Sequence, residues 1–206
     1  ILSMILYHGS DKQIPTPEWG KGNPRNDYGQ GFYCTESLEL AKEWACQKNT
    51  DGYANQYELN TQGLDVLDLS QEPFNLLHWL TILMQNRVFS PKSPIGKQNL
   101  QFLTDRFHLD YQQYDIIRGY PANDSYFSFA NDFLENIIPV QNLASSMKLG
   151  SLGLQTVLKS KKSFERLTFV KTIFSPKEKY YSKYKERDTA ARKSYLEGLR
   201  KVSPSD

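Results

Sequence analysis

The sequence is poor in cysteine and contains no long hydrophobic run. Only two of its 206 residues are cysteines, and Cys34 and Cys46 form neither a disulfide framework nor a metal-ligand spacing. No segment approaches the apolar length that a membrane-spanning helix requires. The N-terminus lacks a charged region followed by an apolar stretch, so we expect no secretory signal. These absences predict a cytoplasmic protein with no metal site and no membrane partner.

An excess of charge is confined to one end of the chain. The formal net charge is +2, which gives no reason to expect a nucleic-acid partner. Residues 176–206, however, hold nine Lys or Arg against five Asp or Glu, and their tyrosines fall near one helical stripe. We therefore expect residues 176–206 to form a basic C-terminal helix that docks on the rest of the chain. The alternative is a nucleic-acid-binding arm, because tyrosines are interspersed with the lysines.

Short apolar strands and amphipathic helices follow one another without strict alternation, which favours an α+β fold over a doubly wound sheet. Residues 74–84 are rich in apolar side chains and predict a core helix inserted as a helical lobe. Residues 11–30 form a long irregular loop, and such loops are often functional. The expected strands are 4–8, 31–35, 54–59, 64–69, 113–119, 154–158 and 168–174, and the expected helices are 37–48, 74–85, 97–107, 126–136, 140–147 and 177–201.

Two N-terminal motifs carry residue types that can hold a flat, polar ring. Residues 7–10 read Tyr-His-Gly-Ser and place His8 at the end of an apolar strand. Residues 29–33 read Gly-Gln-Gly-Phe-Tyr and place Tyr33 in a strand entered through a glycine turn. The helix that follows brings Trp44 within reach of Tyr33 if it folds back on the strand. The structural alternatives are a histidine that bonds a backbone carbonyl and a tryptophan of the core.

This pattern resembles the ADP-ribosyltransferase superfamily, in its histidine–tyrosine–glutamate branch. More narrowly, the chain is similar to the bacterial domain-of-unknown-function family 3990 over roughly residues 5–174. The resemblance implies a core of two packed small β-sheets with a helical insertion, here residues 1–175. It also implies that NAD is a co-substrate, that the nicotinamide–ribose bond is cleaved, and that ADP-ribose passes to an unknown macromolecule.

The resemblance assigns roles to individual residues. His8, Gly9 and Ser10 would position NAD, while Tyr33 and Trp44 would cover the two faces of nicotinamide. The family resemblance further suggests a toxin or defence effector that a partner protein, such as an antitoxin, neutralises.

Gln155 stands where the family places a glutamate on a late strand. With His8 and Tyr33 it completes the expected catalytic set. An amide accepts a hydrogen bond from a ribose hydroxyl, but it supplies no negative charge to an oxocarbenium-like transition state. This departure favours mono-ADP-ribosyl transfer by a weakened enzyme, or a non-catalytic module that binds NAD or another nucleotide. The structural alternative for Gln155 is a polar residue of an edge strand.

Two further charged residues are candidates for NAD binding. Asp124 follows a strand and is expected either in the site or as the N-cap of the next helix. Arg25 lies in the long loop beside Asp27, where its guanidinium can bind pyrophosphate or form an exposed ion pair. His78 and His108 lie on amphipathic helices, where we expect core or surface roles.

Overall fold

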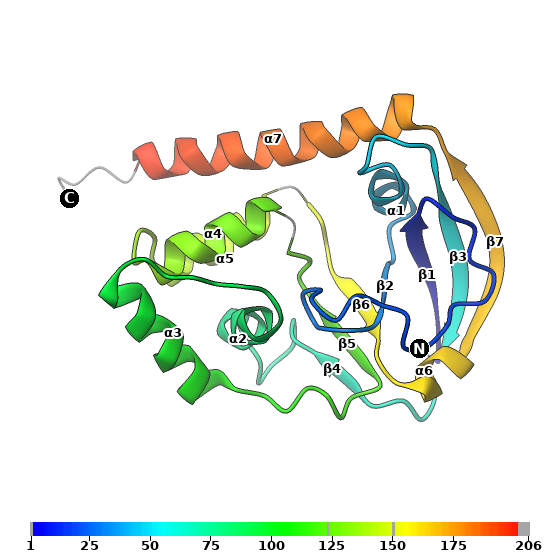
Figure 1. The fold of residues 1–206 in the computed structure, drawn as a ribbon, viewed down its shortest axis with the longest axis horizontal. Helices are drawn as coiled ribbons and strands as arrows, with labels where there is room; N and C mark the ends of the chain where they lie inside the picture. Colours follow the sequence, from blue (N-terminus) through cyan, green and yellow to red (C-terminus); the bar gives the residue numbers. More distant parts are fainter. Residues whose placement is uncertain (1, 123, 150, 202–206) are drawn as a thin grey trace.

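The computed structural model describes residues 2–122, 124–149 and 151–201, although the side chains of Asp124 and Lys201 lie outside the description. Strands and helices are interspersed as expected for an α+β protein (Figure 1). The strands are β1 (Ser3–Ser10), β2 (Phe32–Thr35), β3 (Gly52–Asn60), β4 (Val66–Asp68), β5 (Ile116–Gly119), β6 (Gln155–Leu158) and β7 (Leu167–Ser175). The helices are α1 (Leu38–Ala45), α2 (Leu76–Asn86), α3 (Pro94–Phe107), α4 (Asp124–Leu134), α5 (Val140–Ser146), α6 (Lys161–Glu165) and α7 (Lys177–Lys201).

Hydrogen bonding links the strands into one seven-stranded sheet in the order β4-β5-β6-β2-β1-β3-β7. The expectation of two separate small sheets is therefore corrected. The join between β1 and β2 is slight, since their register within the described residues consists of the pair Tyr7 and Thr35. By contrast, β1 and β3 pair along eight residues of each strand, from Ser3 with Asn60 to Ser10 with Tyr53. The sheet thus has two halves, β4-β5-β6-β2 and β1-β3-β7, that meet at a narrow junction.

The two halves also pack against each other. Leu6 and Tyr57, from β1 and β3, share one buried cluster with Phe32 and Leu158, from β2 and β6. The rings of Phe32 and Tyr57 meet edge to face with centroids 5.5 Å apart. Because successive side chains of a strand point to opposite faces, the neighbouring Val157 belongs to a different cluster on the other face. The half β4-β5-β6-β2 is therefore covered on both sides.

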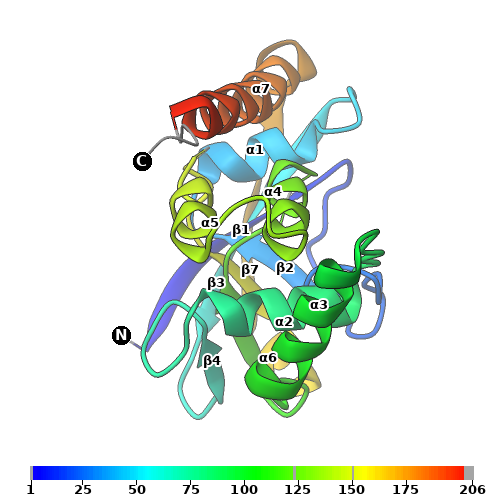
Figure 2. The same cartoon turned by 90° about the vertical axis from the view of Figure 1, so that its left-hand side faces the viewer.

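A helical lobe covers the second face of that half. Helices α2 to α5 lie together beside β4, β5 and β6 (Figures 1 and 2). The apolar run predicted as a core helix forms α2, whose buried residues include Trp79, Leu80 and Ile82. These side chains share the larger core cluster with Ile117 and Val157 of the sheet. The lobe therefore packs against β6, the strand that carries Gln155, through this cluster.

Helix α1 packs so closely on β1 that the contact requires small residues. Ser37 caps the helix by accepting a hydrogen bond from the backbone N–H of Leu40 at 3.3 Å. A Cβ added to Gly9 would lie 2.1 Å from the carbonyl oxygen of Ala41 and 2.8 Å from the backbone nitrogen of Ala45. Glycine on the strand and alanines on the helix therefore bring the two backbones together.

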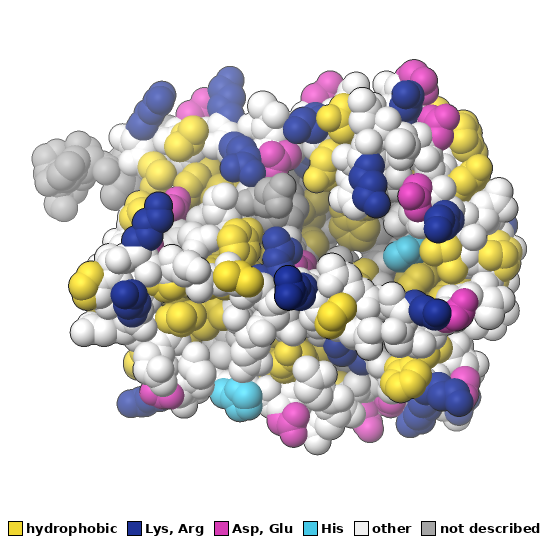
Figure 3. Space-filling view, in the orientation of Figure 1, with side chains coloured by type: hydrophobic (Ala, Val, Ile, Leu, Met, Phe, Trp, Pro, Cys, Tyr) yellow, Lys and Arg dark blue, Asp and Glu magenta, His cyan; other side chains and the backbone are white. Residues whose placement is uncertain are grey.

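The C-terminal basic stretch forms the single long helix α7, which lies across α1 and extends toward α4 and α5 (Figures 1 and 2). Arg187 donates two hydrogen bonds of 2.8 Å to the buried carboxylate of Glu43 on α1. Closer to the C-terminal end of α7, the hydroxyl of Tyr195 donates to Asp132 of α4 at 2.5 Å. On the face drawn in Figure 3, basic side chains are mixed with acidic ones and do not gather into one patch. Within the described residues, the stretch expected as a basic helix is therefore helical from Lys177 to Lys201 and contacts α1 and α4.

Candidate active site

A cavity of about 370 Å³ opens beside the junction between the two halves of the sheet. Its lining comes from β1, β2, α1, β6, the long loop, the end of α2 and one residue of α7. Five residues singled out from the sequence, which are far apart along the chain, line it together: His8, Gly9, Tyr33, Trp44 and Gln155. The fold thus joins the two N-terminal motifs and the late strand in one cleft.

His8 is held by a hydrogen bond across the β1–β2 junction. Its Nδ1 lies 2.7 Å from the backbone carbonyl oxygen of Tyr33, and its ring stacks on Phe32 with centroids 4.2 Å apart. Burial lowers the pKa of His8, and the bond to the Tyr33 carbonyl opposes this shift. A carbonyl only accepts, so in the neutral ring Nδ1 carries the proton and Nε2 keeps its lone pair. Among the described residues Nε2 has no partner, so it can accept a hydrogen bond from a ligand.

The hydroxyl of Tyr33 is fully used by the backbone of the preceding turn. It donates to the carbonyl oxygen of Gly29 at 2.5 Å and accepts from the N–H of Tyr28 at 3.0 Å. Burial raises the pKa of Tyr33, so the hydroxyl stays protonated at any ordinary pH. Gly29 has a φ of 76°, which favours glycine in this turn. These bonds fix the ring, whose face remains for a ligand.

Trp44 borders the cavity from the side of α1, and it is half-buried. A smaller hollow of about 140 Å³ adjoins it, and Ser10 lines this hollow rather than the main cavity. Gly9 lines both. After Tyr7, which pairs with β2, strand β1 continues through His8, Gly9 and Ser10. Within the described part of the sheet these three residues pair with β3 on one side and with no strand on the other. One edge of β1 therefore faces the cleft without a neighbouring strand.

Gln155 begins β6, in the interior of the sheet. It pairs with Thr35 of β2 on one side and with Gly119 of β5 on the other, so the alternative of an edge-strand residue is wrong. Its side chain is buried, with 8% of the residue exposed. The amide oxygen Oε1 has no hydrogen-bond partner in the part of the chain that the structure describes. A buried acceptor without a partner is costly, and a ligand donor in the cavity would satisfy it.

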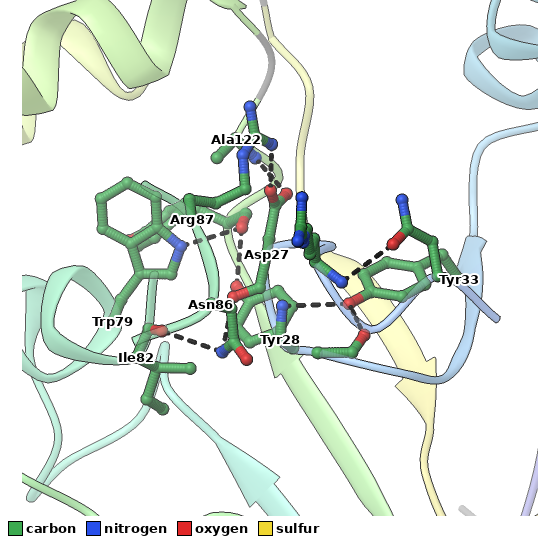
Figure 4. Close-up of polar contacts among 12 residues, drawn as sticks. Asp27, Tyr28, Tyr33, Trp79, Ile82, Asn86, Arg87 and Ala122 are labelled. Atoms are coloured by element: carbon green, nitrogen blue, oxygen red, sulfur yellow. Dashed lines mark hydrogen bonds and ion pairs between the residues drawn. The ribbon is translucent and has the colours of Figure 1, made fainter. Parts of the chain in front are cut away.

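An ion pair that the sequence did not reveal lines the same cavity (Figure 4). Arg87, just after α2, lies 2.8 Å from a carboxylate oxygen of Asp27. The other carboxylate oxygen accepts from the backbone N–H of Ala122 at 2.9 Å. Burial raises the pKa of Asp27, and the Ala122 N–H and the Arg87 charge oppose this shift. The Arg87 guanidinium has five donors, so donors remain for an anionic ligand.

Arg25 and Asp124 have different outcomes. The side chain of Arg25 is exposed, and it is not among the residues that line the cavity. The expectation that Arg25 faces the site is therefore corrected, and Arg87 supplies the cation. Asp124 is the first residue of α4, but its side chain lies outside the described residues. His78 instead completes the capping box of α2, and His108 is exposed beside Gln85.

Chemically, the cavity combines an aromatic pair, a neutral imidazole, an unpartnered amide oxygen and an arginine–aspartate ion pair. This combination suits a ligand with a flat ring, hydroxyl donors and a negatively charged group. Across the described residues, no group of three or more His, Cys, Asp or Glu side chains is arranged to hold a metal ion. Within the same residues, no helix is both long and apolar enough to cross a membrane.

The comparisons with known proteins identify one family. Searches of curated proteins and of solved structures found no match. A family model described as "Protein of unknown function (DUF3990)" matches residues 4–169. The match includes both N-terminal motifs, Arg87 and Gln155, and it ends before α7. The chain therefore belongs to the DUF3990 family.

Proposed function

We propose that the protein is an NAD-dependent mono-ADP-ribosyltransferase-like enzyme, which cleaves the nicotinamide–ribose bond and transfers ADP-ribose to a macromolecule. One observation carries this proposal: His8, Gly9, Tyr33, Trp44 and Gln155 line a single cavity. The narrow join that divides the single sheet into two packed halves, with the cavity beside it, also supports the proposal, although the resemblance implies two small sheets and hydrogen bonds link the halves into one. The polar groups of the cavity fit NAD. The amide oxygen of Gln155 lacks a hydrogen-bond donor among the described residues, and a ribose hydroxyl of NAD can supply one.

Nicotinamide, ribose and pyrophosphate each have a group of suitable chemistry in the cavity. Nicotinamide would lie between the rings of Tyr33 and Trp44, with its carboxamide on the open edge of β1 at Gly9. The lone pair of His8 Nε2 and the amide oxygen of Gln155 would accept from ribose hydroxyls. Arg87 would bind the pyrophosphate, in place of Arg25. These contacts would orient the dinucleotide for displacement of nicotinamide.

The amide at Gln155 predicts slow chemistry. Cleavage places positive charge on the ribose, and a charge–charge contact at partial exposure contributes on the order of 1–4 kcal/mol. Without a carboxylate at this position the reaction would be slower by roughly tenfold to a thousandfold. Asp27 is the one carboxylate among the described residues that line the cavity, and it would supply part of the missing negative charge.

We further propose a biological role and a cellular location. The resemblance suggests a bacterial toxin or defence effector that a partner protein such as an antitoxin controls. The free, buried thiols of Cys34 and Cys46 agree with a reducing cytoplasm.

The test uses labelled NAD. The protein is incubated with NAD labelled in the adenylate part and a bacterial lysate, and acid-precipitable label is measured for wild type, His8→Ala and Tyr33→Ala. We expect label with the wild type and at least tenfold less with each variant. His108→Ala, which changes an exposed histidine outside the cavity, serves as the matched control and should label as the wild type does. Equal labelling by all four proteins would exclude this site as the catalytic one.

A second function is favoured by the same Gln155: a module that binds NAD without turning it over. Gln155→Glu separates the two functions, because it restores the charge that the reaction needs. Faster labelling by this variant indicates a weakened enzyme. NAD binding without turnover in both wild type and variant indicates the module.

A further inference from the structure

A second cavity of about 410 Å³ lies on the other side of the turn that supports Tyr33. The two cavities share no lining residue, but they are adjacent. Asp27 and Arg87 line the first cavity, whereas Gly29 and Asn86, which are close to them in the chain, line the second. The second cavity is enclosed by the loop from Trp19 to Gly31 and by residues 159–164. It therefore belongs to a separate part of the surface.

The loop that forms this cavity is tied down from within. The side-chain amide of Gln30 donates to the carbonyl oxygens of Gly20 and Gly22, at 2.8 and 2.9 Å. The ammonium group of Lys159 donates to the carbonyl oxygens of Tyr28 and Gln30, at 2.5 and 2.6 Å. The cavity is thus formed before any ligand arrives, which lowers the entropic cost of binding.

An indole ring stands fixed at the rim. Trp19 is 57% exposed, and its Nε1 donates to the backbone carbonyl oxygen of Lys159 at 3.0 Å. That bond occupies the polar atom of the side chain, while more than half of the residue remains exposed. A large aromatic ring held in this way is a platform on which a planar ligand can stack.

The surroundings of the cavity favour an anionic ligand. The two segments that enclose it, residues 19–31 and 159–164, contain five basic residues and one acidic residue, Asp27, which lines the other cavity. The basic residues are Lys21, Arg25, Lys159, Lys161 and Lys162. Lys21 pairs with Glu18, Lys162 pairs with Asp115, and the Lys159 ammonium is bonded to two backbone carbonyls, so Arg25 and Lys161 are the cations left for an anion. None of the residues that line the second cavity is a carboxylate. The amide nitrogen of Asn86 is bonded within the protein, so the amide oxygen of Asn86 and the amide of Gln112 are the groups that suit the edge of a base.

We propose that this cavity binds a base of single-stranded nucleic acid, stacked on Trp19, with neighbouring phosphates on Arg25 and Lys161. An aromatic platform in basic surroundings is the combination by which proteins hold unpaired bases. The proposal stands on this cavity and not on the NAD chemistry. It also differs from the arm expected at the C-terminus, since it places nucleic-acid contacts on the loop 19–31 and not on α7.

The experiment measures the fluorescence anisotropy of fluorescein-labelled single-stranded RNA and DNA of about ten nucleotides at low salt. We expect the wild type to bind and Trp19→Ala to bind about tenfold or more weakly, because the stacking contact is lost. Trp19→Phe keeps a ring and should retain most of the binding. Arg25→Ala should weaken binding and make it less sensitive to salt.

Four further measurements are the controls. Trp44→Ala changes a tryptophan of the first cavity, and Lys185→Ala with Lys193→Ala removes exposed charge from α7; both proteins should bind as the wild type does. Thermal unfolding of Trp19→Ala checks that the exposed substitution leaves the fold intact. Saturating NAD should not displace the oligonucleotide.

Four outcomes would overturn the proposal: no binding by the wild type, equal binding by Trp19→Ala, loss of binding only in the α7 variant, or displacement by NAD. None of them bears on the labelling test of the first cavity, which has its own variants. If the proposal is correct, Trp19→Ala loses affinity for the oligonucleotide but binds NAD as the wild type does.

Discussion

The imidazole Nδ1 of His8 lies 2.7 Å from the backbone carbonyl oxygen of Tyr33. This bond joins the two N-terminal motifs at the point where β1 and β2 separate. It fixes which nitrogen of the ring carries the proton and directs the remaining lone pair to a ligand. The arrangement has consequences that separate measurements can check.

Acidification should destabilise the protein through His8. Burial lowers the pKa of His8 below its ordinary value of 6.5, so below pH 6.5 the unfolded chain binds more protons than the folded one. The free energy of unfolding therefore falls as the pH drops through 6.5 toward the lowered pKa. Urea unfolding at pH 7 and at about pH 5 measures this slope.

In His8→Gln we expect a smaller slope, because a half-buried histidine with a lowered pKa is gone. Some slope remains, since burial also lowers the pKa of His78. An unchanged slope in His8→Gln would mean that His8 is not buried as a neutral ring.

The Tyr33 hydroxyl should contribute to stability more than to ligand stacking. Tyr33→Phe leaves the N–H of Tyr28 and the carbonyl oxygen of Gly29 without their partner, which costs about 1–3 kcal/mol. The ring remains, so NAD affinity should fall less than in Tyr33→Ala. Chemical denaturation and calorimetry with NAD give the two quantities, and equal affinities of the two variants would contradict a stacking role.

Arg87, and not Arg25, should govern NAD affinity. Loss of a charged hydrogen bond to pyrophosphate predicts about a tenfold weaker affinity for Arg87→Gln. The double variant with Asp27→Asn avoids leaving a buried carboxylate unpaired and should show a similar loss. Arg25→Ala should bind NAD as the wild type does, and a larger effect at Arg25 than at Arg87 would reverse the assignment.

The contact between Glu43 and Arg187 should anchor α7. The Glu43 side chain is 3% exposed, so Arg187→Ala leaves a buried charge and should cost about 3 kcal/mol. The nearby pair of Lys183 and Glu39 has 43% and 50% of its side chains exposed. Lys183→Ala should therefore cost less than about 1 kcal/mol. Thermal unfolding of both variants makes the comparison, and equal losses would argue against α7 as a firmly docked helix.

Local sequence patterns predicted most of the strands and helices because each has its own periodicity. Helix α3 begins at Pro94, three residues before its predicted start, because Ser93 caps it. Helix α6 was missed, since five residues are too few to establish a helical repeat. The single join between β1 and β2 could not be predicted, because it depends on how the two halves of the sheet pack.

The candidate site divides in the same way. His8, Gly9, Tyr33 and Trp44 stand in short motifs on adjoining elements, so their meeting could be expected from the sequence. Arg87 has no such motif: it follows a core helix more than fifty residues after Tyr33, and only the packing of the lobe brings it to Asp27. Arg25 is two residues before Asp27 in the chain, yet Arg25 is exposed while Asp27 is buried.

The most direct test of the central claim is isothermal titration of the protein with NAD. We expect the wild type to bind one NAD, Tyr33→Ala and Trp44→Ala to bind at least tenfold more weakly, and Trp19→Ala to bind as the wild type does. Absence of binding by the wild type, or equal binding by all four proteins, would contradict the assignment of the cavity between His8, Tyr33 and Trp44 to NAD.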